Sequence, residues 1–394
     1  MRVLFVTHRF PGAAFRGDQV RARAQIRELS QRHNITLLTF QRLPETHQAL
    51  AAMRDLGVEV IMVPRDRLAM LLRAAWAMFS GRAIQLALFD APALREQFAA
   101  TLCALPRFDL VHLQLIRLER LIEEAHSVPV VLDLVDALSV NMSSRAESAR
   151  WPVPRLYCEE GRRLARHEEL AVKRVAGSVI SANTDAIALG SPDRLVVAPN
   201  GVDLDEFSEG PDAAVREHLI FHGNWAYGPN QSGLRWLLRT VMPRVWQTRP
   251  DVRLRLAGAN PERIRSLLGD ARIDLLGQVP SPAAALQRAA VSVAPVHAGS
   301  GQSLKILEAM ACGTPVVTTR RAATAIAGDG TCPCLAADDP DTFAEAILRL
   351  LDDVPDRRRL AAASRGFVES TFSWAHSNAV LESVWNQAAS AMRK

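Results

Sequence analysis

Residues 299–318 read GSGQSLKILEAMACGTPVVT, a pattern that predicts the end of a strand, a glycine turn, a short helix and a second strand. Glycine lets a backbone turn tightly and approach a ligand, and the N-terminus of the following helix favours an anion. Lys305 adds a positive charge one turn into that helix, and Glu308 follows on the same face. The segment is therefore suited to hold a diphosphate on its amides and lysine, with the carboxylate accepting hydrogen bonds from ribose hydroxyls. A packing turn beside a solvated Lys–Glu pair is the alternative.

Length and composition indicate a folded protein with more than one core. The chain has 394 residues, 48% of them hydrophobic and 23% charged, so two domains of ordinary size are expected. The first residues, MRVLFVTH, are apolar over too short a stretch for a signal peptide and predict a first strand. Five scattered cysteines fit reduced thiols. The expected location is cytoplasmic, with the inner face of the cytoplasmic membrane as a candidate place of action.

Net positive charge is concentrated in the first half of the chain. Residues 1–190 contain 25 Lys and Arg against 20 Asp and Glu, whereas residues 191–394 are balanced. A basic half favours an anionic partner, either a lipid surface or a phosphorylated acceptor. An arginine-rich composition shared with a GC-rich genome is the alternative. No nucleic-acid partner is expected, because no binding motif accompanies the charge.

Short apolar runs alternate with helix-like segments along the whole chain. The predicted strands are 3–7, 35–40, 58–63, 110–113, 128–134, 178–181 and 195–198, followed after a break by 219–222, 253–257, 273–276, 291–295 and 315–318. Hydrophobic strands separated by helices indicate parallel sheets covered on both faces. We therefore expect an α/β protein of two Rossmann-like domains, whose sheets face an interdomain cleft.

The expected domain boundaries follow from the break in this pattern. The N-terminal domain is expected over 1–205 and the C-terminal domain over 206–372, with a hinge at 199–207 marked by Pro and Asn-Gly. Residues 373–394 are expected to form a helix that returns to the N-terminal domain. Ligands of such sheets bind outside the carboxyl ends of the strands. We therefore expect the segments that follow strands in both halves to converge on one space.

Several segments resemble one enzyme family over nearly the full length. The segments are RVLFVTHRFP at 2–11, RGDQVR at 16–21, DLVDALS at 133–139, PNGVD at 199–203, FHGNWAYGPN at 221–230 and the 299–318 stretch. The first two resemble the first strand and glycine loop of sugar transferases with the GT-B fold. All six segments together resemble glycosyltransferase family 4. Among the members of that family, they are most similar to the sugar transferases associated with bacterial exopolysaccharide gene clusters.

The resemblance implies a nucleotide-sugar donor and sugar transfer with retention of anomeric configuration, without a metal or other cofactor. It implies a glycan or lipid-linked acceptor on the N-terminal side, the donor on the C-terminal side, and a role in exopolysaccharide or surface-polysaccharide synthesis. The catalytic candidates are Lys305, Glu308 and His112. The donor-binding candidates are Gly17, Asp18, Asn224, Gly258, Ser300, Gly301, Gln302, Ser303, Leu304, Lys305 and Glu308.

Two departures from the family pattern bear on the donor site. Family members commonly carry two glutamates eight residues apart, whereas here Ser300 occupies the first position and Glu308 the second. Many members also carry an Arg and a Lys after the first strand of the C-terminal domain. Residues 223–230 hold no cation, so Lys305 is expected to supply most of the positive charge.

Other motifs carry weaker signals. Many relatives have a second histidine two residues after His112, where this chain has Gln114, and His112 itself fits either a cleft residue or a core histidine. The Asp-x-Asp at 203–205 lies in the hinge and predicts no metal site. The Gly-x-Gly at 299–301 lacks the third glycine of a dinucleotide fingerprint. Two alternatives to a transferase stay open: a nucleotide-sugar epimerase of the same fold, and a catalytically degenerate scaffold subunit.

Residues 65–89 mix apolar and aromatic side chains with arginines in a helix-compatible pattern. The pattern comprises Arg65, Arg67, Leu71, Leu72, Arg73, Trp76, Met78, Phe79 and Arg82. One interpretation is a helix lying at an anionic membrane surface, with its arginines among the headgroups. The other is an amphipathic helix packed on its own sheet, with its arginines in water.

Overall fold

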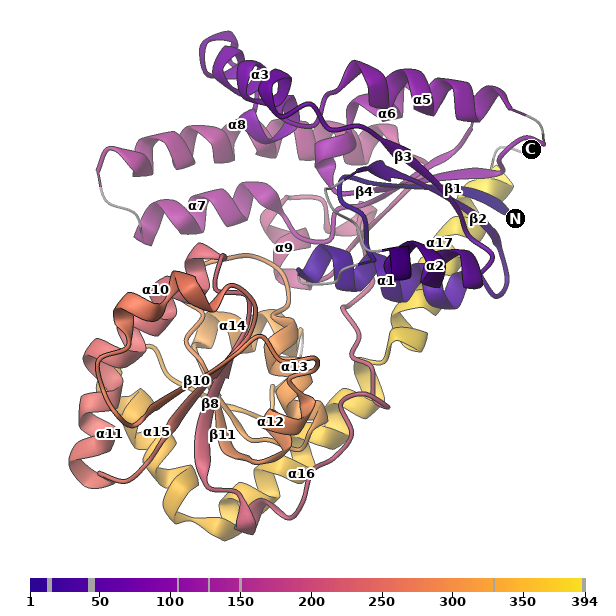
Figure 1. Ribbon diagram of the computed structural model, residues 1–394. Helices are drawn as coiled ribbons and strands as arrows, with labels where there is room; N and C mark the ends of the chain where they lie inside the picture. Colours follow the sequence, from indigo (N-terminus) through magenta and orange to yellow (C-terminus); the bar gives the residue numbers. More distant parts are fainter. Residues whose placement is uncertain are drawn as a thin grey trace. The chain divides into compact units, whose positions relative to one another are not determined.

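A computed structural model describes residues 1–12, 16–41, 47–104, 106–126, 128–148, 151–328 and 330–391. The chain divides into two compact units (Figure 1). Unit 1 comprises Met1–Pro199 and Ser377–Lys394, and unit 2 comprises Asn200–His376. The division falls at the Pro-Asn-Gly segment that punctuates the sequence. None of the helices in the described part of the chain is long and apolar enough to span a membrane.

Unit 1 is built on a parallel sheet with the strand order β3-β2-β1-β4-β5-β6-β7. The strands are β1 (Arg2–Thr7), β2 (Asn34–Phe40), β3 (Glu59–Val63), β4 (Leu110–Gln114), β5 (Val130–Asp133), β6 (Gly177–Ile180) and β7 (Val196–Val197). Successive side chains of β1 point to opposite faces, so Phe5 enters one core and Leu4 and Val6 enter the other. Both faces are therefore apolar and must be covered by helices.

Helices cover both faces of the unit 1 sheet (Figure 1). One face carries α1 (Gly17–Leu29), α2 (His47–Asp55) and α17 (Trp374–Ala391). The other carries α3 (Arg67–Ser80), α4 (Ile84–Ala87), α5 (Pro92–Cys103), α6 (Arg120–Glu124), α7 (Leu138–Ser148), α8 (Val153–Arg174) and α9 (Asn183–Ala188). Short 3₁₀ turns lie at Ile116–Leu118 and Pro192–Arg194.

The last helix, α17, belongs to unit 1 over most of its length. The Trp385 side chain is fully buried there and contacts Phe5 edge-on. Glu382 on the same helix forms ion pairs with Arg32 at 2.9 Å and His33 at 2.7 Å. The end of the chain thus completes the core of the unit that its beginning forms.

Unit 2 repeats the same strand order with its own strands, β10-β9-β8-β11-β12-β13, all parallel. The strands are β8 (His218–His222), β9 (Leu254–Ala257), β10 (Ile273–Gly277), β11 (Ala289–Ala294), β12 (Val316–Thr318) and β13 (Leu335–Ala336). Figure 1 shows α10 (Gly228–Trp236), α11 (Met242–Thr248) and α15 (Pro340–Asp352) along one face, and α12 (Ala283–Gln287), α13 (Leu304–Ala311) and α16 (Val354–Thr371) along the other. Helix α14 (Arg320–Ala327) packs on the second face. Leu237–Val241 forms a π-helical turn between α10 and α11, and 3₁₀ turns lie at Ala213–Val215, Pro261–Arg263 and Arg265–Leu267.

Each strand expected from the sequence overlaps a strand of the structure. The expectation missed β13, because a strand of two residues offers no apolar run that a sequence pattern could reveal. The two sheets share the order 3-2-1-4-5-6 of doubly wound folds, counted along each unit. This confirms the predicted α/β class with two parallel-sheet domains.

Candidate functional site

The strand order of each sheet reverses at one point, and ligands of such sheets bind beside that point at the carboxyl ends of the strands. In unit 2 the reversal lies between β8 and β11. The segments that leave these two strands are residues 223–227 and 295–303. The donor-binding candidates of the C-terminal half lie on or next to these segments, with Gly258 at the end of the neighbouring strand β9.

The loop 295–303 connects β11 to the N-terminus of α13. Gly299 and Gly301 have φ angles of 124° and 70°, in the region that favours glycine. The N-cap residue Ser303 makes no side-chain capping bond. The first amides of α13 and the helix dipole are therefore oriented to receive an anion, as the sequence pattern predicts.

Lys305 lies in the first turn of α13, beside the ends of β8 and α10. Its Nζ donates to Asn230 Oδ1 at 2.5 Å and lies 5.4 Å from the centroid of the Phe221 ring. Burial lowers the pKa of the Lys305 ammonium to about 8, and the negative charge of Glu308 opposes part of this shift. An ammonium has three donors, so Lys305 can bind a phosphate oxygen while it keeps the contact with Asn230.

Glu308 lies one turn further along α13 and is held by the end of β8. Its Oε2 atom lies 2.8 Å from His222 Nε2, and its side chain is 19% exposed to solvent. His222 is the last residue of β8 and is almost fully buried. The contact fixes one carboxylate oxygen and leaves the group partly open to a ligand, which suits an acceptor of hydroxyl hydrogen bonds.

An asparagine network fixes the loop between β8 and α10. Asn230 Nδ2 donates to the carbonyl of Asn224 at 2.8 Å, and Asn224 Oδ1 accepts from the amide of Ala226 and from Asn260 Nδ2, both at 2.9 Å. Asn260 follows β9, so the network joins the ends of two neighbouring strands. Asn224 therefore orients the loop that holds the partner of Lys305.

Gly258 allows the ends of β8 and β9 to approach closely. A Cβ atom at this position would lie 1.8 Å from the carbonyl oxygen of Gly223, a distance that no side chain tolerates. Its φ angle of 140° also favours glycine. Gly258 therefore serves the shape of the site through its backbone.

The remaining candidates of the glycine loop have different surroundings. Gln302 Oε1 accepts from the amide of Asn200 at 2.9 Å, which ties the loop to the Pro-Asn-Gly segment. The Leu304 side chain packs against the unit 2 core. Ser300 lies half-buried in the loop. Arg321 on α14 donates to the carbonyl of Gly299 at 3.0 Å, so a second cation stands beside the loop.

Two of the donor-binding candidates lie in unit 1, at the N-terminus of α1. Gly17 opens this helix, and Asp18 pairs with Arg9 at 2.9 Å and lies 3.4 Å from His8. Gln114, at the end of β4, donates to the carbonyl of Asp18 at 2.9 Å. The carboxyl ends of β1 and β4 thus meet at the start of α1.

His112 lies in the core of unit 1. The side chain is fully buried, its ring centroid is 4.1 Å from that of Phe5, and its Nδ1 atom accepts from Trp385 Nε1 at 3.1 Å. Burial lowers the pKa of His112 to about 4, with a smaller contribution from the charge of Arg21 and an opposing one from Asp133. Of the two interpretations that the sequence left open, this placement corresponds to the core histidine, and we do not carry His112 forward as a catalytic residue.

The hinge carboxylates have a local structural role. Asp203 Oδ1 accepts from the backbone amides of Asp205 at 3.2 Å and Glu206 at 3.3 Å, as in an Asx turn. Over the described ranges of the chain, no group of three or more His, Cys, Asp or Glu side chains is placed to hold a metal ion.

Sequence reasoning missed His222, Asn230 and Arg321 as members of the site. His222 ends a strand that the sequence predicts correctly, so the rule that ligands bind at carboxyl ends of strands was the signal that could have revealed it. Asn230 ends the 221–230 segment, and an uncharged amide gives no signal for a diphosphate site. No local pattern marks Arg321.

Residues 216–353 match the family model described as glycosyl transferases group 1. The matched stretch contains the glycine loop, Lys305, Glu308, His222 and Asn230. Most of unit 2 is therefore similar to this family.

The chain spans about half the length of the curated relatives that it matches. Phosphatidyl-myo-inositol mannosyltransferase of Mycobacterium leprae is 34% identical over 208 residues, which cover 50% of this chain and 54% of the relative. Among solved structures, sucrose-phosphate synthase from Thermosynechococcus elongatus has a TM-score of 0.74 at 17% identity and covers 99% of both chains. Anabaena HepE in complex with UDP and glucose has a TM-score of 0.67 at 15% identity and covers 97% of this chain and 98% of HepE. These structural likenesses establish the GT-B fold.

Proposed function

We propose that the protein is a retaining glycosyltransferase that moves a sugar from a nucleotide-sugar donor, bound on unit 2, to a glycan or lipid-linked acceptor. The observation that carries the proposal is the pairing of Lys305 and Glu308 at the N-terminus of α13, each oriented by a residue from another element. A cation and helix amides suit a diphosphate, and a partly open carboxylate suits ribose hydroxyls. The family match of the same residues supports this assignment.

In the proposed reaction the bond from sugar C1 to the donor diphosphate breaks, and negative charge grows on the leaving phosphate. Lys305 and the first amides of α13 stabilise that charge without rearranging. The acceptor hydroxyl attacks from the face that the diphosphate leaves, and the departing phosphate oxygen takes its proton. No cofactor or metal ion takes part in the proposed reaction.

The acceptor class and the biological role are the finer parts of the proposal. A relative named for a phosphatidyl-myo-inositol acceptor supports a lipid-linked acceptor, while exopolysaccharide or surface-polysaccharide synthesis rests on the sequence resemblance alone. We place the reaction at the inner face of the cytoplasmic membrane, where nucleotide sugars and lipid acceptors meet.

A donor assay tests the reaction class. The full chain, treated with excess EDTA, is incubated with UDP- and GDP-linked hexoses with and without a lipid-linked acceptor, and NMR identifies the anomers formed. A retaining transferase gives an α-linked product from an α-linked donor and survives the chelator. Release of an epimerised sugar without acceptor would indicate the epimerase, and nucleotide binding without turnover the scaffold. Loss of activity restored by Mg²⁺ or Mn²⁺ would contradict metal independence.

The lowered pKa of Lys305 predicts a pH dependence of nucleotide binding. With a pKa of about 8, the free protein loses the Lys305 charge as pH rises through 8, so a diphosphate loses a cationic partner. The apparent Kd for UDP or GDP, measured calorimetrically from pH 7.5 to 9.5, should rise up to about tenfold per pH unit above that value. In Lys305→Arg the guanidinium stays charged and the dependence should disappear. A flat profile for the wild type would contradict the role of Lys305.

Helix α3 presents an apolar face to the solvent. The exposed members are Leu68 at 68%, Leu71 at 65%, Leu72 at 64%, Trp76 at 64% and Phe79 at 89%. They recur three and four residues apart and so share one face, while Met70 and Ala77 are buried in the unit 1 core. An ordinary surface helix shows the reverse pattern. A helix with Trp and Leu outward suits insertion at the boundary of a membrane.

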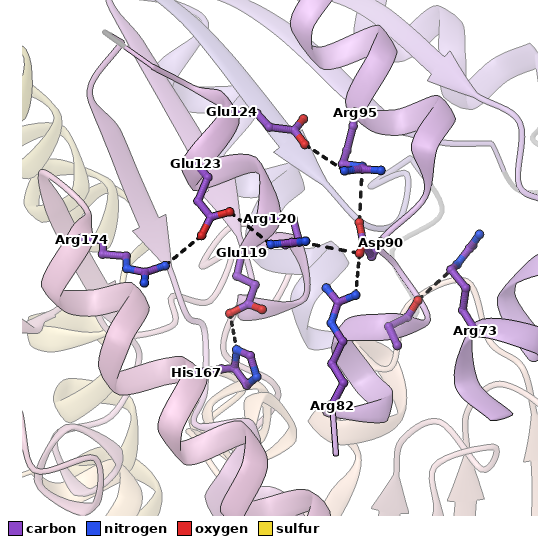
Figure 2. Close-up of polar contacts among 11 residues, drawn as sticks. Arg73, Arg82, Asp90, Arg95, Glu119, Arg120, Glu123, Glu124, His167 and Arg174 are labelled. Carbon is purple, nitrogen blue, oxygen red and sulfur yellow. Dashed lines mark hydrogen bonds and ion pairs between the residues drawn. The ribbon is translucent and has the colours of Figure 1, made fainter. Parts of the chain in front are cut away.

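Three of the four arginines of this region contact other residues of unit 1. Arg82 pairs with Asp90 at 2.8 Å, and Arg73 donates to the carbonyl of Ala87 at 3.3 Å (Figure 2). Arg65 lies 5.4 Å from the Phe89 ring centroid, and Arg67 is exposed. These contacts occupy Arg65, Arg73 and Arg82 within unit 1. We therefore propose that the exposed apolar side chains of α3 make the contact with an anionic membrane.

A flotation assay tests this membrane contact. The wild type should float with vesicles of phosphatidylcholine and phosphatidylglycerol, and the variant Leu72→Ser/Trp76→Ser/Phe79→Ser should lose most of that binding, since three inserted side chains are removed. Ile187→Ser, which alters an exposed apolar residue on α9, is the matched control. Wild-type protein that does not float with these vesicles at low salt would contradict the membrane contact. A dimer that the triple variant dissociates would show that the apolar face of α3 binds a second copy of the chain.

A further inference from the structure

Two cysteines flank a proline in a short turn of unit 2. The turn, called here the Cys-Pro-Cys turn, comprises residues 332–334 and lies between α14 and β13. The amide of Cys334 donates to the carbonyl of Cys332 at 2.8 Å, which closes the turn over three residues. Pro333 suits the central position, because proline fixes φ near the value that an inverse γ-turn requires and has no amide to leave unpaired. The local sequence therefore favours this turn.

Contacts with the rest of unit 2 hold the Cys-Pro-Cys turn in place. Ser364 on α16 donates its hydroxyl to the carbonyl of Pro333 at 2.8 Å. The residues that follow the turn pair with β12 as strand β13. Cys332 is 8% exposed and lies in the core that α13 and α14 share, and Cys334 packs against the same core while it stays partly accessible. The two thiols are therefore held in one arrangement.

The two thiols of the turn share a hydrogen bond. That bond, followed by burial, raises the pKa of the Cys332 thiol far above its ordinary value, so Cys332 keeps its proton and is the donor. The same bond lowers the pKa of Cys334, although burial opposes the shift. Because the thiolate is the reactive form of cysteine, Cys334 is the more nucleophilic sulfur of the two.

The other three cysteines of the chain have different surroundings. Each of them is far from any other cysteine in the sequence. Cys312 follows α13 and is buried, and burial raises the pKa of its thiol to about 12. Cys103 on α5 and Cys158 on α8 are exposed thiols of unit 1. The sequence and the structure thus single out one adjacent pair, in which a buried thiol donates to a partly accessible one.

We propose that Cys332 and Cys334 form a redox-active pair that a peroxide converts into a disulfide. A disulfide joins residues whose Cα atoms lie about 4.4–6.8 Å apart, a separation that two residues across so tight a turn can reach. The partly accessible Cys334 meets the oxidant, and the buried Cys332 is placed to resolve the product. This redox role is separate from the transferase function proposed above and does not depend on it.

The oxidation takes place in two steps. In the first step the Cys334 thiolate attacks one oxygen of hydrogen peroxide, the O–O bond breaks, and Cys334 becomes a sulfenic acid while the departing hydroxide takes up a proton to form water. In the second step the Cys332 sulfur attacks the Cys334 sulfur, the S–O bond breaks, and the Cys332 proton leaves with the oxygen as water. Two thiols and one peroxide thus give one disulfide and two waters.

Mass spectrometry of the full chain after treatment with hydrogen peroxide tests the pair. The peptide that contains Cys332 and Cys334 should become lighter by two hydrogens, and dithiothreitol should restore its mass. The matched control is Cys103→Ser/Cys158→Ser, which removes the two exposed thiols of unit 1 and should form the same disulfide. A peptide that loses no hydrogen, or a disulfide that joins Cys312 to either cysteine, would refute the proposal.

Single substitutions in this control background test which sulfur reacts with the peroxide. In Cys332→Ser the sulfenic acid at Cys334 lacks its thiol partner and should accumulate, and dimedone should trap it. In Cys334→Ser the remaining thiol is buried and protonated, so about tenfold less dimedone adduct should form. Thermal unfolding shows whether both variants are folded. Equal trapping in the two variants would overturn the assignment to Cys334, and no trapping in folded Cys332→Ser would refute the redox role.

Discussion

Lys305→Ala should lower sugar transfer at least a hundredfold. The lysine is the cation in the first turn of α13, and its Nζ is already oriented by Asn230 at 2.5 Å. Removal of one preorganised donor to a developing negative charge costs on the order of 3 kcal/mol in the barrier, which is about two orders of magnitude in rate. Initial rates with a saturating nucleotide sugar measure the effect directly.

The control for this prediction is another lysine of the same chain. Lys173 on α8 is exposed and pairs with Glu169 at 2.5 Å, and Lys173→Ala should keep full activity. Thermal unfolding of both variants shows whether the fold is intact, which matters because Lys305 is partly buried. Full transfer activity in folded Lys305→Ala would exclude Lys305 from the proposed reaction.

Glu308→Gln should weaken nucleotide binding by roughly ten- to a hundredfold. An ionised carboxylate that accepts hydrogen bonds contributes about 1.5–3 kcal/mol, and the amide that replaces it is a weaker acceptor. The same change alters the contact with His222 at 2.8 Å, which orients the group. Calorimetric titration with UDP and GDP gives the change in Kd.

The comparison of two ligands separates the roles of the two residues. Inorganic diphosphate lacks the ribose, so Glu308→Gln should leave its affinity nearly unchanged, whereas Lys305→Ala should weaken both inorganic diphosphate and the nucleotides. Glu369→Gln alters an exposed glutamate that pairs with Arg365 on α16, and it serves as the matched control. Equal loss of diphosphate affinity in Glu308→Gln would contradict contact with the ribose.

The polar network around Asp90 shows why surface arginines are difficult to assign from sequence. Asp90 forms ion pairs with Arg82 at 2.8 Å and with Arg95 at 3.5 Å (Figure 2). The two arginines come from different segments of the chain. A helical pattern of arginines and apolar residues is compatible with both membrane contact and internal pairing. The partners that decide between them come from elements outside the pattern.

Features that depend only on neighbouring residues follow from the sequence alone. Apolar runs of four to seven residues specify strands, and the glycines, Lys305 and Glu308 lie within ten residues of one another, so local geometry brings them to one helix start. The Pro-Asn-Gly segment likewise marks the division near residue 200 through its own backbone preferences. The fold class and the central residues of the proposed donor site therefore follow from local sequence.

Contacts between side chains that lie far apart in the sequence depend on the tertiary structure. His222 contacts Glu308 across 86 residues, and Asn230 contacts Lys305 across 75. Packing against α17, the last helix of the chain, buries His112, and the end of β4 brings Arg117 to His8. Such contacts depend on strand order and on helix packing, in which residues far apart in the chain fill one space. Local patterns in a single sequence therefore do not predict these contacts.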